Sequence, residues 1–177
     1  MEQLIEQVVW AIDKSHSSIN FSISHFMIAR VKGHFTDFEG TLTSIDDNFE
    51  SATIDLTIQA GSINTNEVNR DNHLKTADFF DVAQFPDIRF SSNLFEKVSG
   101  NEYLIKGMLT VNGIEKPIVL EATYAGTFEH PVYKKTIAVF EVKAEIPRLD
   151  FNIGANYPAA VLGESVKLTA SLELVRQ

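Results

Sequence analysis

The five histidines are the side chains of this sequence best suited to acid–base or metal chemistry near neutral pH. No two of them lie four residues apart or form a His-x-His pair, the spacings that common metal sites use. The absence of cysteine excludes a disulfide, a thiolate metal site and a cysteine nucleophile. No glycine-rich phosphate loop and no G-x-S-x-G motif occurs. We therefore expect neither a metal site nor a cofactor.

His25 is the histidine placed best to meet a ligand, because it follows Ile23 on the apolar face of an alternating segment. It could act as a general base, or it could hydrogen-bond to the head group of a ligand. The alternative is a histidine at the rim of the fold, bonded to a backbone carbonyl or a carboxylate. For catalysis we favour this structural interpretation.

Two arginine–aspartate pairs are the other charged groups with suggestive spacing. Arg148 and Asp150 share one side of an extended segment, and Arg70 precedes Asp71 directly. A lone buried arginine is costly, so partners are expected. We interpret both pairs as structural ion pairs near one end of the fold.

The length of 177 residues fits a single domain, residues 1–177, with a sizeable core. The net charge of −9 argues against a nucleic-acid partner. No stretch approaches the ~20 apolar residues that span a bilayer, so we expect no membrane insertion. Glu2 and Glu6 interrupt what would be the apolar region of a signal peptide. The sequence as given is therefore expected in the cytoplasm, or in the periplasm if a leader has been removed.

Apolar and polar residues alternate along almost the whole chain, which predicts β-strands with one dry and one wet face. A phase slip at Asp37–Phe38 is typical of a β-bulge. Eight or so such segments occur, at about 19–23, 31–42, 52–58, 88–94, 103–111, 118–128, 138–146 and 166–174.

Short turns join these segments. The turn residues are 46–48, 99–101 and 112–113, all rich in Asp, Asn or Gly. Short links imply antiparallel neighbours in an up-and-down order, and a sheet of eight strands avoids bare edges by closing. The exception is 64–86, where Asn66 or Asn69 can cap a short helix over 70–77. We predict an all-β, eight-stranded antiparallel up-and-down lipocalin-like barrel with this helix capping one end.

An eight-stranded barrel either fills with side chains or holds one small ligand. The predicted dry face mixes large residues such as Phe21 and Phe90 with small ones such as Gly107 and Ala144. The small residues either allow close packing in a filled barrel or line a lumen in a hollow one. A hollow interior would be almost wholly apolar and would select a long hydrocarbon by area burial. Replacing Gly107 or Ala144 with Phe should then block the lumen.

Six segments, spread from Trp10 to Val175, resemble one known family. The run from Ile63 to Pro86, with RD-x-HL, ADFFD and FP in order, is the longest and most specific. The others are WAID (10–13), HSSINFSISH (16–25), VKGHFTDFEG (31–40), GMLTVNGIEKPIVL (107–120) and RLDF (148–151).

On these motifs the chain resembles the YceI-like family, lipocalin-like proteins that bind polyisoprenoids and other long apolar lipids. The resemblance implies a hollow barrel with an apolar tunnel, capped by the helix, and a possible homodimer. The chain departs from the family pattern at 26–29, which lacks the glycine usual after His25, and at Pro147 and Asn152. These departures bear on the identity of the ligand more than on the fold.

Three hypotheses follow. The leading one is a non-enzymatic protein that binds, sequesters or transports a polyisoprenoid, an isoprenoid quinone or a fatty-acyl compound. The second is an enzyme that acts on an apolar substrate with His25 as general base, and the third is a filled barrel that serves as a scaffold. The side chains expected to contact a ligand are Phe21, Ile23, His25, Phe35, Phe38, Ile54, Leu56, Phe79, Phe80, Phe90, Leu109, Phe140, Ala144 and Leu168.

Overall fold

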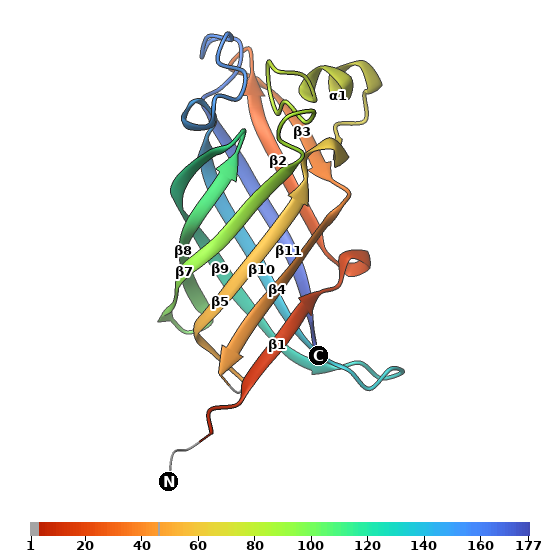
Figure 1. The fold of residues 1–177 in the computed structure, drawn as a ribbon, viewed down its shortest axis with the longest axis vertical. Coiled ribbons are helices and arrows are strands. Elements are labelled where there is room, and N and C mark those ends of the chain that lie inside the picture. The colour runs from red at the N-terminus through yellow and green to blue at the C-terminus, as the bar shows by residue number, and fades with distance from the viewer. Residues whose placement is uncertain (1–3, 46) are drawn as a thin grey trace.

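The alternating segments form antiparallel strands that close into a tall barrel, with a short helix at one end (Figure 1). The computed structural model describes residues 4–45 and 47–177. The elements are β1 (Gln7–Ile12), η1 (Lys14–His16), β2 (Ser18–His25), β3 (Ala29–Phe35), β4 (Phe38–Ile45), β5 (Asn48–Gln59), η2 (Ala60–Ser62), β6 (Ile63–Asn64), α1 (Val68–Leu74), β7 (Asp87–Ser99), β8 (Glu102–Val111), β9 (Ile114–Glu129), β10 (Thr136–Pro147), η3 (Arg148–Phe151) and β11 (Ser165–Arg176).

Eight strands close the ring in the order β1-β4-β5-β7-β8-β9-β10-β11, with β11 pairing back to β1. The strands β2, β3 and β6 extend the sheet from β11. β1 and β2 both pair with β11, so together they form one long strand beside β11 that η1 interrupts. β3 and β4 likewise follow one another with a two-residue break, which lies at the predicted phase slip. The predicted up-and-down barrel with eight strands is confirmed.

Two turns show why the strands connect as they do. Asn112 and Gly113 both have positive φ, +53° and +70°, and join β8 to β9 in a tight hairpin as predicted. Gly100, with a φ of +53°, turns β7 into β8. The third predicted turn includes Asp46, which lies outside the described residues.

The helix differs from its prediction at both ends. α1 begins at Val68 and its N-cap is Glu67, whose carboxylate accepts from the backbone N–H groups of Asn69 and Arg70. Asn66 instead has a φ of +61°, which is compatible with a turn and not with a cap. Among the described residues, no helix is long and apolar enough to cross a membrane.

The lower half of the barrel, opposite α1, is filled by aromatic rings. Phe140 lies at the centre of this cluster, 5.2 Å from Phe49 and 5.1 Å from Tyr124 between ring centroids. Phe95 and Tyr103 lie 6.0 and 6.2 Å from Phe140 on the same measure. The Nε1–H of Trp10 donates to Ser44 at 3.0 Å at the edge of the cluster, so its polar atom is satisfied. We call Trp10, Phe49, Phe95, Tyr103, Tyr124 and Phe140 the aromatic plug.

Glycines on the inner face are covered by neighbouring side chains and do not line open space. A Cβ at Gly107 would lie 2.6 Å from the ring of Phe90 and 2.3 Å from the carbonyl oxygen of Ser91. A Cβ at Gly33 would lie 2.4 Å from the ring of Phe21. The expectation that Gly107 leaves lumen volume is therefore wrong, because Phe90 already fills that space. A Gly107→Phe substitution would disrupt the wall instead of blocking the lumen.

Candidate functional site

The upper half of the barrel encloses a cavity of about 450 Å³. This volume lies within the ~300–1,000 Å³ typical of small-molecule sites. Most of its wall is aliphatic, contributed by Ile, Leu and Val from the ring strands and from β2. The aromatic plug lies outside this wall and closes the cavity from below. The barrel is thus hollow at the helix end and filled at the other.

Eleven of the fourteen side chains predicted to contact a ligand line this cavity. They belong to β2, β3, β5, β7, β8, β11 and the segment after α1. The eleven are Phe21, Ile23, His25, Phe35, Ile54, Leu56, Phe79, Phe80, Phe90, Leu109 and Leu168.

Phe38, Phe140 and Ala144 do not line it. Phe140 is buried in the aromatic plug. Phe38 is buried in the core beside Ile58, its partner across the β4–β5 pair, and Ile58 takes the cavity position. Ala144 lies on the inner phase of β10 between Val142 and Ile146, which both reach the cavity while its own methyl group does not.

Several wall residues were missed by the sequence analysis although their strand phase was recognised. Ile88 and Phe90 share a face of β7, and Val142 and Ile146 share a face of β10. The phase was lost further along β7, where the register with β8 shifts between Ser92 and Leu94. The remaining missed strand residues are Ile19, Val31, Ile58, Ile63, Ile105, Val111, Ile118, Leu120, Val166, Ala170 and Leu172.

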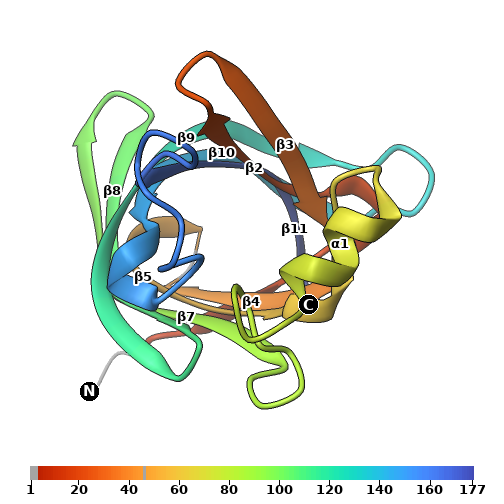
Figure 2. The ribbon, with the colours of Figure 1, turned by 90° about the horizontal axis from the view of Figure 1, so that it is seen from above.

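Two segments cover the mouth of the cavity. Seen from above, α1 and the chain after η3 lie on opposite sides of the ring opening (Figure 2). Phe79 follows α1 and stacks on Tyr157 of the second segment, with ring centroids 5.5 Å apart. His73 packs edge-on to Phe79 at 5.2 Å, and its Nε2 lies 3.0 Å from a carboxylate oxygen of Asp78. These contacts make the mouth aromatic at its surface and polar at its rim.

Asn112 links the stretch after α1 to the last residue of η3, where the second covering segment begins. Its side-chain amide donates to the backbone carbonyl of Phe79 at 2.7 Å and to that of Phe151 at 2.9 Å. The left-handed backbone of the β8–β9 turn aims this side chain under both segments. The sequence analysis recognised Asn112 only as a turn residue, and nothing in its spacing indicated the second role.

Arg148 is fully buried at the cavity wall without a carboxylate partner among the described residues. Its guanidinium donates to five backbone carbonyls, those of Ile153, Gly154, Tyr157, Leu162 and Gly163, at 2.6–3.1 Å. Burial lowers the pKa of the guanidinium, and the carboxylate of Glu164 opposes that shift. The predicted pair with Asp150 is wrong, because η3 leaves Asp150 exposed while Arg148 turns inward.

The second predicted pair also differs. Arg70 donates from Nε and Nη2 to Thr65, and Asp71 accepts from the backbone N–H and hydroxyl of the same Thr65. The two charged side chains therefore share one neutral residue and no direct ion pair. This arrangement fixes the start of α1 over the mouth.

His25 lies at the cavity wall where β2 ends. Its ring contacts the ring of Phe26 at 4.3 Å, and its backbone pairs with Leu162. Among the described residues, no hydrogen bond from this ring to a carboxylate or a carbonyl is present, so the partner expected for a structural histidine is missing. The imidazole faces a cavity and has a free hydrogen-bonding edge.

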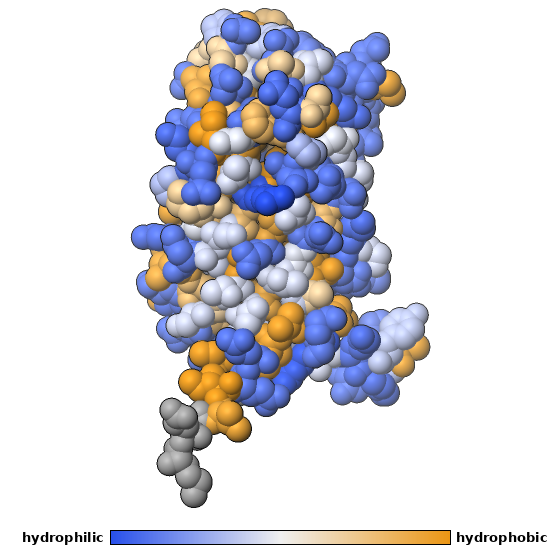
Figure 3. Space-filling view, viewed as in Figure 1, coloured by the Kyte–Doolittle hydropathy of each residue, from blue (hydrophilic) through white to orange (hydrophobic). Residues whose placement is uncertain are grey.

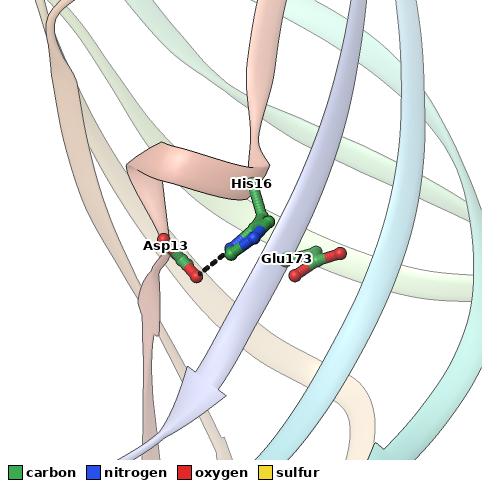
Figure 4. Close-up of side chains that lie close together, drawn as sticks. All are labelled: Asp13, His16 and Glu173. Atoms are coloured by element: carbon green, nitrogen blue, oxygen red, sulfur yellow. Dashed lines mark hydrogen bonds and ion pairs between the residues drawn. The ribbon is translucent and has the colours of Figure 1, made fainter. Parts of the chain in front are cut away.

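A second cluster of titratable groups lies on the barrel wall at η1, away from the cavity (Figure 4). Asp13 caps η1, accepts from Ser15, and its Oδ2 lies 2.8 Å from Nδ1 of His16, with Glu173 beside them. Hydrogen bonds from Ser15 and then His16 lower the pKa of Asp13, and Asp13 raises the pKa of His16. The sequence analysis did not find this group because Glu173 lies on β11, far from Asp13 and His16 in the sequence. The hydrogen bonds of Asp13 to Ser15 and His16 already explain it as the cap of η1.

The comparisons with known proteins agree with this geometry. The family profile of the YceI-like domain matches residues 10–174. The chain belongs to the YceI-like family. One relative, Protein YceI of Salmonella newport, is 38% identical over 170 residues, which cover 95% of this chain and 87% of that protein.

Two solved structures of the YceI-like fold extend the comparison. The YCEI protein of Campylobacter jejuni is 31% identical, with a TM-score of 0.80, over 93% of this chain and 96% of its own. A domain of Saccharophagus degradans described as polyisoprenoid binding has a TM-score of 0.69 at 14% identity, over 95% of this chain and 98% of that domain. At that identity the second comparison shows the fold alone.

Proposed function

We propose that this YceI-like protein binds one long apolar lipid in the upper cavity and releases it unchanged. The observation that carries the proposal is a cavity of about 450 Å³ with an aliphatic wall, closed below by aromatic rings and covered above by two segments. Burial of hydrocarbon in such a site is favourable by about 25 cal/mol per Å². The candidates are a polyisoprenoid, an isoprenoid quinone or a fatty-acyl compound.

The polar groups of the site lie at its mouth, which supports a ligand with a polar head and an apolar tail. They are His25, Arg70, His73, Arg148 and Tyr157. Arg148 is saturated by carbonyls, whereas His25 keeps a free edge. The Saccharophagus degradans domain, which shares this fold, is itself described as polyisoprenoid binding.

An enzyme would need an acid and a base within reach of one reacting atom. Among the described residues, His25 has no carboxylate or hydroxyl bonded to it, and the other histidine of the wall, His73, has its Nε2 bonded to the exposed carboxylate of Asp78 at the rim. Binding without turnover is the function that fits this arrangement.

The test is native mass spectrometry of the protein after gentle extraction, followed by Ala170→Phe. Ala170 lines the cavity between Ile19 and Val142, so an added ring enters the space that the tail would occupy. We expect a copurified lipid mass on the parent protein, and an affinity for it at least about thirtyfold lower in the variant, because the buried apolar area is lost.

The matched control is Thr169→Phe, which adds the same ring on the exposed face of the same strand. It should bind as the parent does. Equal binding by Ala170→Phe and Thr169→Phe would show that the ligand lies elsewhere.

A further inference from the structure

The β2–β3 hairpin ends in three bulky apolar side chains that point into solvent. Phe26, Met27 and Ile28 are 62%, 78% and 94% exposed. Phe26 and Met27 also have positive φ, 50° and 67°, in a region that asparagine and glycine adopt far more easily. Exposure and backbone strain at the same two positions serve neither folding nor solubility. The hairpin tip is therefore suited to contact another molecule or a surface.

The tip is continuous with the mouth of the cavity. The ring of Phe26 packs against His25, and its backbone N–H donates to the carbonyl of Val161 at 2.9 Å. His25 and Val161 both line the cavity. Val161 belongs to the stretch Tyr157–Gly163, which contains no charged residue, and neither does 25–29. Two uncharged loops thus form one apolar rim beside the opening through which a lipid enters.

Basic residues follow the apolar rim on the outer face of the barrel. Lys32 and Lys167 flank Ser22 as its backbone partners on β3 and β11, and Arg30 donates to the hydroxyl of Ser22 at 3.0 Å. All three cations are exposed. The nearest acidic residues are Glu145, which pairs with Lys167 between β10 and β11, and Glu164, which follows the apolar rim in the sequence. At ~3.3 Å per residue, Arg30 lies two residue pairs below the tip, about 7 Å, and Lys32 and Lys167 lie four pairs below it, about 13 Å. Arg30 is therefore at the level of head groups when apolar side chains enter a bilayer, and the two lysines lie beneath it with long side chains that reach toward that level.

We propose that the hairpin tip, residues 26–28, docks the protein on the surface of a lipid bilayer, with Arg30, Lys32 and Lys167 facing anionic head groups. This inference rests on the proposed function, because a lipid too apolar for water has to be collected from a bilayer. It concerns three side chains at the interface and differs from the insertion of a spanning segment. Interfacial binding of this kind combines buried apolar area with attraction to anionic lipids.

The test is flotation with vesicles of equal parts phosphatidylcholine and phosphatidylglycerol. The variant Phe26→Asn/Met27→Gly/Ile28→Ser should bind the vesicles at least about tenfold more weakly, since the apolar contact is lost. Its melting temperature should not fall, because Asn and Gly relieve the two left-handed positions. The variant Lys32→Glu/Lys167→Glu should weaken binding about threefold, and added salt should shrink that difference.

The matched control is Val132→Ser/Tyr133→Ser. These side chains are 72% and 73% exposed in the β9–β10 hairpin at the opposite end of the barrel, and their removal should leave flotation unchanged. Absence of flotation by the parent, equal flotation by the tip variant, or an equal loss in the control would overturn the proposal. So would a parent dimer that the tip variant turns into a monomer with flotation unchanged.

A second readout separates this inference from the proposed function. A fluorescent fatty acid, added without vesicles, should bind to the tip variant as tightly as to the parent, whereas Ala170→Phe should lose it and still float. Loss of the fatty acid by every protein with flotation intact would count against the proposed function alone. Retained fatty-acid binding with no flotation by any protein would count against docking alone.

Discussion

The two halves of the barrel share most of their strands and have opposite interiors. β5 carries Phe49 in the lower half and Leu56 in the upper half, and β10 carries Phe140 below and Ile146 above. Below, rings from six strands meet and fill the interior, and above, aliphatic side chains leave about 450 Å³ open. The strands β5, β7, β8, β9 and β10 contribute side chains to both interiors, whereas β1 contributes to the aromatic plug and β2 and β3 to the cavity wall. On the strands that serve both levels, the volume of the side chains decides whether the interior is open or filled.

The outer surface does not show this difference. On the face seen in Figure 3, the middle of the barrel is mainly hydrophilic, and hydrophobic side chains gather near the N-terminal segment. Leu4 and Ile5 are among the exposed apolar residues there, at the filled end. The contrast between the halves is thus internal, and the following changes test it in order of expected effect.

The largest effect is expected at the covered mouth of the hollow half. Arg148→Met keeps most of the side-chain volume and removes the guanidinium from five buried or partly buried carbonyls. We expect a loss of roughly 4 kcal/mol or more of unfolding free energy, because each charge-assisted bond contributes about 1.5–3 kcal/mol. Urea unfolding measures it. Arg89→Met, which removes an exposed ion pair, should change stability by less than about 1 kcal/mol. Similar losses in both variants would show that the hydrogen bonds of Arg148 do not stabilise the covered mouth.

Next in size is the filled half. Phe140→Ala removes the central ring of the aromatic plug and should cost about 3–5 kcal/mol of unfolding free energy. The affinity for a lipid should stay within about twofold, because the deleted ring does not line the cavity. Phe128→Ala, at an exposed position on β9, serves as the control and should leave both quantities unchanged. A large change in affinity with Phe140→Ala would show that the tail reaches the plug.

The smallest effect is expected at the rim. His25→Ala removes one hydrogen-bonding group and should weaken lipid binding about fivefold, which corresponds to about 1 kcal/mol. Equilibrium titration with the copurified lipid measures it, and His34→Ala, outside the cavity wall on β3, is the control. In an enzyme the same change would slow turnover by roughly 10²–10⁴-fold. A product formed from the lipid by the parent and not by His25→Ala would replace the binding hypothesis with the catalytic one.

The same contrast explains what could be predicted from the sequence. Alternation predicted every long strand except β1, which lies before the first predicted segment, and it predicted most of the inward side chains, because a strand with one buried face has a fixed period of two. It could not distinguish the two halves, because Phe140 and Phe90 follow the same pattern and differ only in the level they occupy. It also could not show the bulge between β9 and β10, beyond which Phe128 lies opposite Ile137 on the outer face and is 56% exposed.

Bulges within the strands and contacts in the loops were the least predictable features. The bulge in β7 moves the inward-facing position from Ser92, whose hydroxyl accepts from the backbone N–H of Ile54, to Phe95. The carbonyls around Arg148 belong to a segment without periodicity, so no pattern pointed to them. Such contacts depend on the path of a loop, and residue type alone does not set that path.

The bridge made by Asn112 has a consequence for the timing of exchange. Because one amide holds the carbonyls of Phe79 and Phe151, we predict that the two covering segments open as one unit and that a bound lipid leaves only after that opening. Residence time is then governed by the lifetime of the closed mouth, while affinity is governed by the wall. Stopped-flow release from Asn112→Ala should be about tenfold faster than from the parent, whereas equilibrium affinity changes little. An unchanged release rate would mean that the ligand leaves without opening the mouth.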